Sequence, residues 1–194
     1  VFIGITFWDF FNKCLIQSVK LIKANKPIVS KVYIPKFILI LVKIGVNGFK
    51  MFISLLIIVA MLAVWRVPIT YNVIYIIPIL MTLIVLVFGF SCYLLHYGVF
   101  VEDLSNVLNI ALRFLFYLTG IFWSIMDRLP APYNSYIGRC NPIAFLLTSA
   151  RDCVIYGSTP HRKLLLLWFV IGLIISALGV RKIYKNENSY VKVI

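Results

Sequence analysis

The stretch from Val73 to Leu95, VIYIIPILMTLIVLVFGFSCYLL, contains no charged residue and exceeds the roughly 20 helical residues that cross a hydrocarbon core. A segment inside lipid must satisfy its backbone polar groups within the protein, so it is a helix or a strand of a closed barrel. Continuous apolar runs favour helices, because barrel strands alternate apolar and polar positions. The stretch is therefore predicted to be a transmembrane helix that tolerates Pro78 as a kink.

Further apolar stretches flank this one along the whole chain. Of the 194 residues, 62% are hydrophobic and only 13% are charged, a composition that excludes a soluble domain. The sequence predicts an all-α, polytopic membrane helix bundle that forms one domain over residues 1–194, with about five transmembrane helices. Besides Val73–Leu95, the predicted spans are Val1–Ile22, Phe37–Trp65, Leu104–Ser124 and Leu164–Val180.

The connections between the spans carry their own signals. Leu21–Lys36 is basic and is interrupted by Pro27 and Pro35, which predicts a short helix around Ile28–Tyr33. His96–Asp103 is predicted to be a short connection. The segment Ile143–Tyr156 is too short to span yet apolar, which is typical of an interfacial or re-entrant helix.

The distribution of Lys and Arg sets the predicted orientation. If Leu21–Lys36 lies in the cytoplasm, the basic tail from Arg181 also lies there, in agreement with the positive-inside rule. Several basic residues between Met126 and Lys163 then lie outside against that rule, so this segment is expected to have a role that offsets the cost. The net charge of +13 gathers at span ends and forms no continuous basic face, which argues against nucleic-acid binding.

Three strings in the chain each resemble a segment of one known protein family. Ile5–Phe11, ITFWDFF, resembles the start of that family's second span, and Asn25–Pro35, NKPIVSKVYIP, resembles the segment that precedes its third span. Asn141–Gly157, NPIAFLLTSARDCVIYG, resembles the segment before its last span. The family is that of the polysaccharide-exporting ABC-2 type transporter permeases, and the resemblance covers essentially the whole chain, with the three strings in the same order.

The resemblance implies the following expectations. The chain would be the permease of an ABC exporter for lipid-linked polysaccharide or teichoic acid in the bacterial plasma membrane. It would work as a homodimer with a separate ATPase subunit that holds ATP and Mg, and it would bind no cofactor and catalyse no reaction itself. The family's amino-terminal amphipathic helix and first span would precede Val1 and are apparently missing here.

The same resemblance assigns a coupling helix and gate helices. The coupling helix would dock in the ATPase, and its predicted residues are Asn25, Ile28, Val29, Lys31, Val32, Tyr33 and Pro35. The alternative for this segment is a basic loop that contacts anionic headgroups. The predicted outer-gate residues are Asn141, Pro142, Arg151, Asp152 and Gly157. The adjacent pair Arg151 and Asp152 is read either as a local ion pair or as a contact to the other protomer.

A translocation path is predicted from the positions of cations and aromatic residues. Lys43, Asn47 and Lys50 recur at helical spacing, so they share one face of a span and are predicted to line the path of an anionic polymer. The alternative is that both lysines extend to the cytoplasmic headgroups. Trp8 and Phe11 are predicted to stack on sugar rings, with ordinary helix packing as the alternative.

The sequence contains few residues that could form an enzyme active site. The chain has no GxxxxGK[ST] phosphate-binding string, and its two histidines are far apart in the sequence. No metal site is predicted, and the four cysteines are interpreted as small apolar residues, with a Cys140–Cys153 disulfide as a lesser possibility. The alternative of a different class is a membrane-embedded glycosyl- or acyltransferase, for which Asp9 would be the deep carboxylate.

Overall fold

The computed structural model describes residues 1–29, 35–65, 70–122, 138–187 and 189–190; for residues 28 and 29 it describes the backbone only. Within these residues the chain is helical and contains no strand, which confirms the predicted all-α bundle. The helices are α1 (Phe2–Val19), α2 (Leu21–Ala24), α3 (Lys26–Val29), α4 (Lys36–Val64), the 3₁₀ helix η1 (Tyr71–Tyr75), α5 (Ile76–Phe100), α6 (Leu104–Leu118), α9 (Pro142–Val154) and α10 (Arg162–Lys185).

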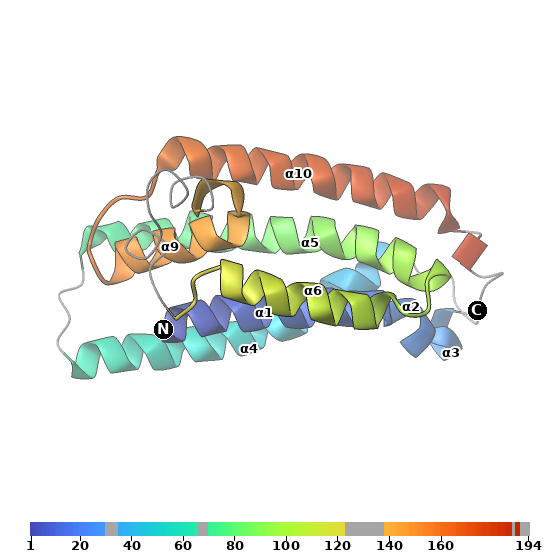
Figure 1. Cartoon of the computed structure of the whole chain (residues 1–194), viewed down its shortest axis with the longest axis horizontal. Helices are drawn as coiled ribbons and strands as arrows, with labels where there is room; N and C mark the ends of the chain where they lie inside the picture. Colours follow the sequence, from blue (N-terminus) through green and yellow to red (C-terminus); the bar gives the residue numbers. More distant parts are fainter. Residues whose placement is uncertain (30–34, 66–69, 123–137, 188, 191–194) are drawn as a thin grey trace.

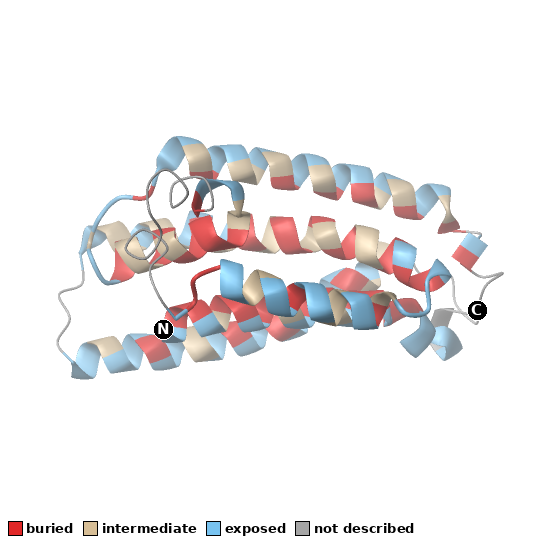
Figure 2. Cartoon of the chain, in the orientation of Figure 1, coloured by how far each residue is buried: buried red, intermediate tan, exposed pale blue. Residues whose placement is uncertain are grey.

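The long helices lie side by side along one direction, so the bundle has two distinct ends (Figure 1). We call the end with α2, α3 and the start of α4 the basic end; the last turn of α10 lies there too. The opposite end, which holds the first residues of α1, the end of α4 and helix α9, is the far end. The buried residues concentrate on α1 and α5, between the outer helices (Figure 2).

Small residues allow α5 and α10 to pack closely. Gly172, Ser176 and Gly179 recur on one face of α10 and meet α5, where Ser176 donates a hydrogen bond of 3.0 Å to the carbonyl of Val85. A Cβ added to Gly179 would lie 2.7 Å from the Cβ of Cys92. Small side chains let helix backbones approach within lipid, where apolar burial itself drives little association. The α5–α10 pair is therefore held by this close backbone packing.

Helix α1 is surrounded by protein on most of its circumference. It contacts α4, α5, α6 and α9, and the side chains of Phe7 and Cys14 are fully buried. Asn47 of α4 donates a hydrogen bond of 3.0 Å to the Gln17 amide oxygen of α1. The polar residues of α1 would be unfavourable if the helix faced lipid. Because α1 packs mainly against its neighbouring helices, these residues are accommodated within the protein.

In the part of the chain that the structure describes, three helices are long and apolar enough to cross a membrane: Lys36–Val64, Tyr71–Phe100 and Arg162–Lys185. The segment Leu104–Leu118 is a shorter apolar helix, so the fourth predicted span is a helix of only 15 residues in the described part of the chain. The prediction of His96–Asp103 as a connection is wrong in its first half, because α5 continues to Phe100. The last helix likewise runs past the predicted end at Val180 to Lys185.

At the basic end, the residues after α10 fold back onto the bundle. Lys36, the first residue of α4, forms a buried ion pair with Glu187, with 3.2 Å between its Nζ and the carboxylate. The hydroxyl of Tyr190 and Nδ1 of His96 share a hydrogen bond of 2.7 Å. We call these four residues the C-terminal clamp. It joins the start of α4 to the last turns of α5.

Candidate functional site

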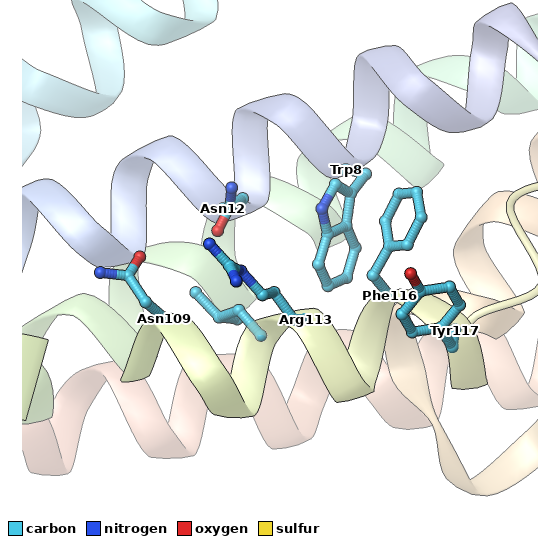
Figure 3. A pocket seen from close by; sticks show the side chains of 7 residues that line it. Trp8, Asn12, Asn109, Arg113, Phe116 and Tyr117 are labelled. Carbon is cyan, nitrogen blue, oxygen red and sulfur yellow. The ribbon is translucent and has the colours of Figure 1, made fainter. Parts of the chain in front are cut away.

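A pocket of about 330 Å³ opens between α1 and α6 (Figure 3). Its walls combine aromatic rings with amide and guanidinium groups, and Arg113 reaches from α6 toward Asn12 of α1 (Figure 3). Trp8 is buried, and its ring meets that of Phe116 edge to face at a centroid distance of 5.4 Å. The lining residues are Trp8, Asn12, Asn109, Leu112, Arg113, Phe116 and Tyr117.

A second, smaller groove of about 70 Å³ lies between α1 and α4. Asp9 and Lys13, one helical turn apart on α1, form an ion pair of 2.7 Å that is about half exposed. Lys50, at the middle of α4, lines the same groove and is exposed. A charged side chain at the centre of a span costs roughly 2.5–3.5 kcal/mol in lipid, so these groups are expected to face protein or water.

The pocket and the groove together form one polar face across α6, α1 and α4. We define the polar face by Asp9, Asn12, Lys13, Lys50 and Arg113. Among the described residues, the side chains of Arg113 and Lys50 form no hydrogen bond or ion pair, and both are exposed. Such a surface can bind anionic groups through its cations and hydroxyl groups through its amides, and the aromatic rings that line the pocket can stack on the apolar faces of sugar rings.

The structure separates the predicted path residues into two groups. Trp8 and Lys50 line the pocket and the groove, respectively. Phe11 is buried and packs against Trp8, with a centroid distance of 5.6 Å between the rings. Asn47 lines the groove as well and is buried there through its hydrogen bond to Gln17. Lys43 is half-buried and lines neither the pocket nor the groove. Of the predicted stripe, Asn47 and Lys50 thus border the groove together, whereas Lys43 lies outside it.

The predicted gate residues Asn141 and Arg151 connect α9 to the far end of α6. The Asn141 side chain accepts hydrogen bonds from the backbone N–H groups of Ile143 and Ala144, which caps α9. Its amide also donates to the hydroxyl of Thr119 at 3.3 Å. Arg151 donates to the carbonyls of Gly120 and Ile121, just beyond the end of α6. A cation at this position also complements the negative end of the α6 dipole.

The other gate residues lie near these contacts. Pro142 occupies the first turn of α9, and Gly157 adopts φ +62°, a conformation that glycine tolerates best. The side chain of Asn72 donates a hydrogen bond to the carbonyl of Gly157. Burial raises the pKa of the Asp152 carboxyl, while the nearby charge of Arg151 opposes that shift. Burial conversely lowers the pKa of Arg151. Asp152 and Arg151 thus influence each other electrostatically without a direct ion pair among the described contacts.

The predicted coupling segment begins with a short helix at the basic end, but α3 spans Lys26–Val29 and so includes Pro27, which was predicted to precede the helix. Its residues Ile28 and Val29 belong to α3, and Pro35 immediately precedes α4. The Asn25 amide donates a hydrogen bond of 2.7 Å to the carbonyl of Leu21 and so closes α2. The remaining predicted residues of this segment, Lys31, Val32 and Tyr33, lie outside the described residues. Their role stays a prediction.

Sequence reasoning missed the polar residues in the α6 wall of the pocket. Asn109 and Arg113 lie four residues apart, which places them on one face of a helix. This polar repeat within a predicted span was the available signal.

Comparisons with known proteins find relatives that match almost the whole chain. The chain is similar to two proteins of Klebsiella pneumoniae, each described as an O-antigen export system permease protein, RfbA. The identities are 23% and 22% over 192 residues, which cover 98% of this chain and 73% of each relative. No protein-family model matches the chain.

The relatives and the three membrane-length helices identify this chain as a membrane protein. The names describe export permeases rather than enzymes, which supports the prediction that the chain has no catalytic activity of its own. Among the described residues, no group of three His, Cys, Asp or Glu side chains gathers where it could hold a metal ion.

Proposed function

We propose that this chain is the permease subunit of an ABC exporter that moves a lipid-linked polysaccharide or teichoic-acid-type polymer outward across the bacterial plasma membrane. ATP and Mg are bound by a separate ATPase subunit, and the permease acts as a homodimer. The similarity to the two O-antigen export permeases over 98% of the chain carries this proposal. The resemblance of three separate strings in the sequence points to the same class of transporter.

The polar face supports a translocation role. Lys50 lies halfway along the membrane-length helix α4, and Arg113 lies on α6 beside the neighbouring helix α1. Lipid is an unfavourable environment for both charged side chains. In the proposed dimer, the polar faces of two copies border a hydrated path, where cations hold anionic groups of the polymer and Trp8 and Tyr117 contact its sugars.

The basic end supports coupling to an ATPase. Short helices α2 and α3 precede Pro35, and α4 starts directly after it, so a force on this segment acts at the base of a 29-residue helix. In the proposed mechanism, ATP-driven closure of the ATPase pushes the coupling segment and reorients α4 relative to α1. The α9 contacts to Thr119 and Gly120 make the far end of α6 move with the gate.

An export assay tests the proposal through Arg113. The chain is produced together with its ATPase in a bacterium whose own export permease has been deleted, and polymer on the cell surface is quantified. Arg113→Gln is expected to lower export by about fivefold, because losing one contact of about 1 kcal/mol changes a rate or affinity by that factor. Arg113 is exposed, so the variant is expected to fold and to retain the ATPase on co-purification.

The matched control is Arg181→Gln, which removes an exposed guanidinium from α10 at a distance from the pocket lining. It is expected to export like the wild type. Equal export by both variants would contradict the assignment of the pocket to the path. A wild-type chain that inserts, yet neither exports polymer nor retains an ATPase, would remove the exporter proposal and favour the transferase alternative.

A further inference from the structure

A groove of about 490 Å³ lies between α5 and α10 at the far end of the bundle, away from the polar face. Its volume lies within the roughly 300–1,000 Å³ that ligand pockets usually occupy. The walls are almost entirely apolar, and the exposed side chains of Ile77, Met81 and Leu166 border it. The lining residues are Tyr75, Ile77, Pro78, Met81, Thr82, Arg162, Leu165, Leu166 and Phe169.

The groove has a cation at one end only. Arg162 is the first residue of α10, and its guanidinium carbon lies 5.1 Å from the centroid of the Tyr75 ring. A cation–π contact of this kind restrains the guanidinium at the mouth of the groove. None of the residues that line the groove is acidic, and Arg162 is the one cation among them. The groove therefore pairs a positive mouth with a long apolar wall.

This arrangement matches the two parts of one amphiphile. Both helices that form the groove are long and apolar enough to cross a membrane, and Arg162 lies at the terminus of one of them. At that level, a lipid phosphate meets the guanidinium while its acyl chain lies along Met81, Leu166 and Phe169. The sequence-based orientation also places Arg162 on the outer side, where a basic residue is disfavoured unless it has a binding partner.

We propose that the α5–α10 groove binds an anionic phospholipid of the surrounding bilayer, with the phosphate at Arg162 and an acyl chain against the apolar wall. The site is separate from the polar face and does not depend on the proposed transport function. A zwitterionic lipid offers the same acyl chain but no net charge for Arg162. The site is therefore expected to select phosphatidylglycerol over phosphatidylcholine.

Native mass spectrometry of the purified protein, with phosphatidylglycerol or phosphatidylcholine added in detergent, tests this selection. The wild type is expected to retain more phosphatidylglycerol, and Arg162→Gln should reduce that retention by about fivefold. Lys163→Gln removes the same charge next to the groove and is the matched control, since Lys163 does not line the groove. It should retain the lipid nearly as well as the wild type. Inorganic phosphate in large excess should not displace the lipid.

A second measurement locates the acyl chain independently of charge. A photoreactive benzoylphenylalanine at position 166 should cross-link to lipid, and Met81→Trp, which fills the groove, should reduce both this cross-link and phosphatidylglycerol retention. Equal retention of the two lipids, equal losses in Arg162→Gln and Lys163→Gln, or displacement by phosphate would overturn the proposal. A cross-link to a second copy of the chain instead of lipid would also overturn it and assign the groove to a protein interface.

Discussion

Gly98 lies where the last turn of α5 passes the end of α1. A Cβ at this position would collide with the backbone carbonyl of Val19, which cannot rotate away as a flexible side chain could. We predict that Gly98→Ala lowers stability by about 1–3 kcal/mol, the usual cost of an added group in a closely packed site. Thermal unfolding of the detergent-purified protein, followed by fluorescence, should show a lower midpoint temperature.

Gly45→Ala is the control for this substitution. Gly45 also lies in a membrane-length helix, but a Cβ there would meet no atom within 4 Å. Because alanine favours a helix over glycine by up to about 1 kcal/mol, Gly45→Ala should keep or slightly raise the midpoint. If both variants unfold at the same temperature, the close approach between α5 and α1 at Gly98 does not contribute to stability.

The cysteines differ in their expected reactivity. All four are free thiols, so the possible disulfide between Cys140 and Cys153 is not formed. Cys140 is exposed, whereas burial, aided by the charge of Asp152, raises the pKa of Cys153 to about 11. The reactive thiolate of Cys153 is therefore scarce at pH 7–8. A maleimide should label the native protein at Cys140 alone and all four cysteines after denaturation, as intact mass measures.

Cys140→Ser provides the control for the labelling experiment. Its native form should take up almost no maleimide, because Cys14, Cys92 and Cys153 are buried. Rapid labelling of this variant in the native state would show that the far end around α9 opens on the timescale of the reaction. The packing of α9 against α1 and α5 would then be looser than described here.

Single residues also show where sequence reasoning reached its limit. The helical spacing of Asn47 and Lys50 was readable, but whether each faces α1 or the outside depends on the crossing of two helices. Asn47 forms a hydrogen bond with Gln17, which is 30 positions away in the chain, and the local sequence around neither residue predicts this bond. Trp8 was predicted for the path and lines the pocket, yet its partner Phe116 belongs to a helix far along the sequence.

At the scale of elements, the C-terminal clamp makes a testable connection between helices. Tyr190→Phe removes the hydroxyl that bonds His96 and leaves a buried imidazole nitrogen without that partner, which costs about 1–3 kcal/mol. Limited proteolysis should therefore cut the residues after α10 faster in this variant. Burial, with the charge of Glu187 adding to it, raises the pKa of Tyr190 to about 12, so the hydroxyl stays protonated and the protection should be constant between pH 7 and 9.

Tyr184→Phe is the matched control for the clamp. Tyr184 is exposed near the end of α10 and makes a ring contact with Phe37, which phenylalanine preserves. Its rate of cleavage should equal that of the wild type. The clamp would be contradicted if Tyr190→Phe and Tyr184→Phe were cleaved equally slowly.

Element boundaries were predictable wherever apolarity ends abruptly. The predicted Phe37–Trp65 and Ile143–Tyr156 match α4 and α9 to within two residues at each end. The prediction failed where polar residues continue a helix. Lys182 of α10 donates a hydrogen bond to the Tyr97 hydroxyl at 2.7 Å and lies 4.2 Å from that ring's centroid. These contacts keep both α5 and α10 helical beyond their apolar cores, and hydropathy alone cannot reveal them.

For the whole molecule, composition was sufficient to predict a membrane helix bundle but not the order of the helices around its axis. Asp9, Lys13 and Arg113 are easily found in the sequence. Their place on a common polar face follows only from the packing of α1 between α4 and α6. The same limit applies to the prediction of function. The family resemblance suggested a transporter from the sequence alone. The polar face, on which the transport proposal partly rests, could be recognised only from the positions of its residues in the folded structure.

The C-terminal clamp also sets an order of events during synthesis. Lys36 emerges from the ribosome early, but its partner Glu187 and the residue that binds His96 are made only after every helix from α4 to α10. A nascent chain can insert its spans while the base of α4 is still unlocked. The basic end therefore becomes rigid last. A chain cut short before Glu187 would still insert into the membrane, but the start of α4 would lack its ion pair and would be held less firmly.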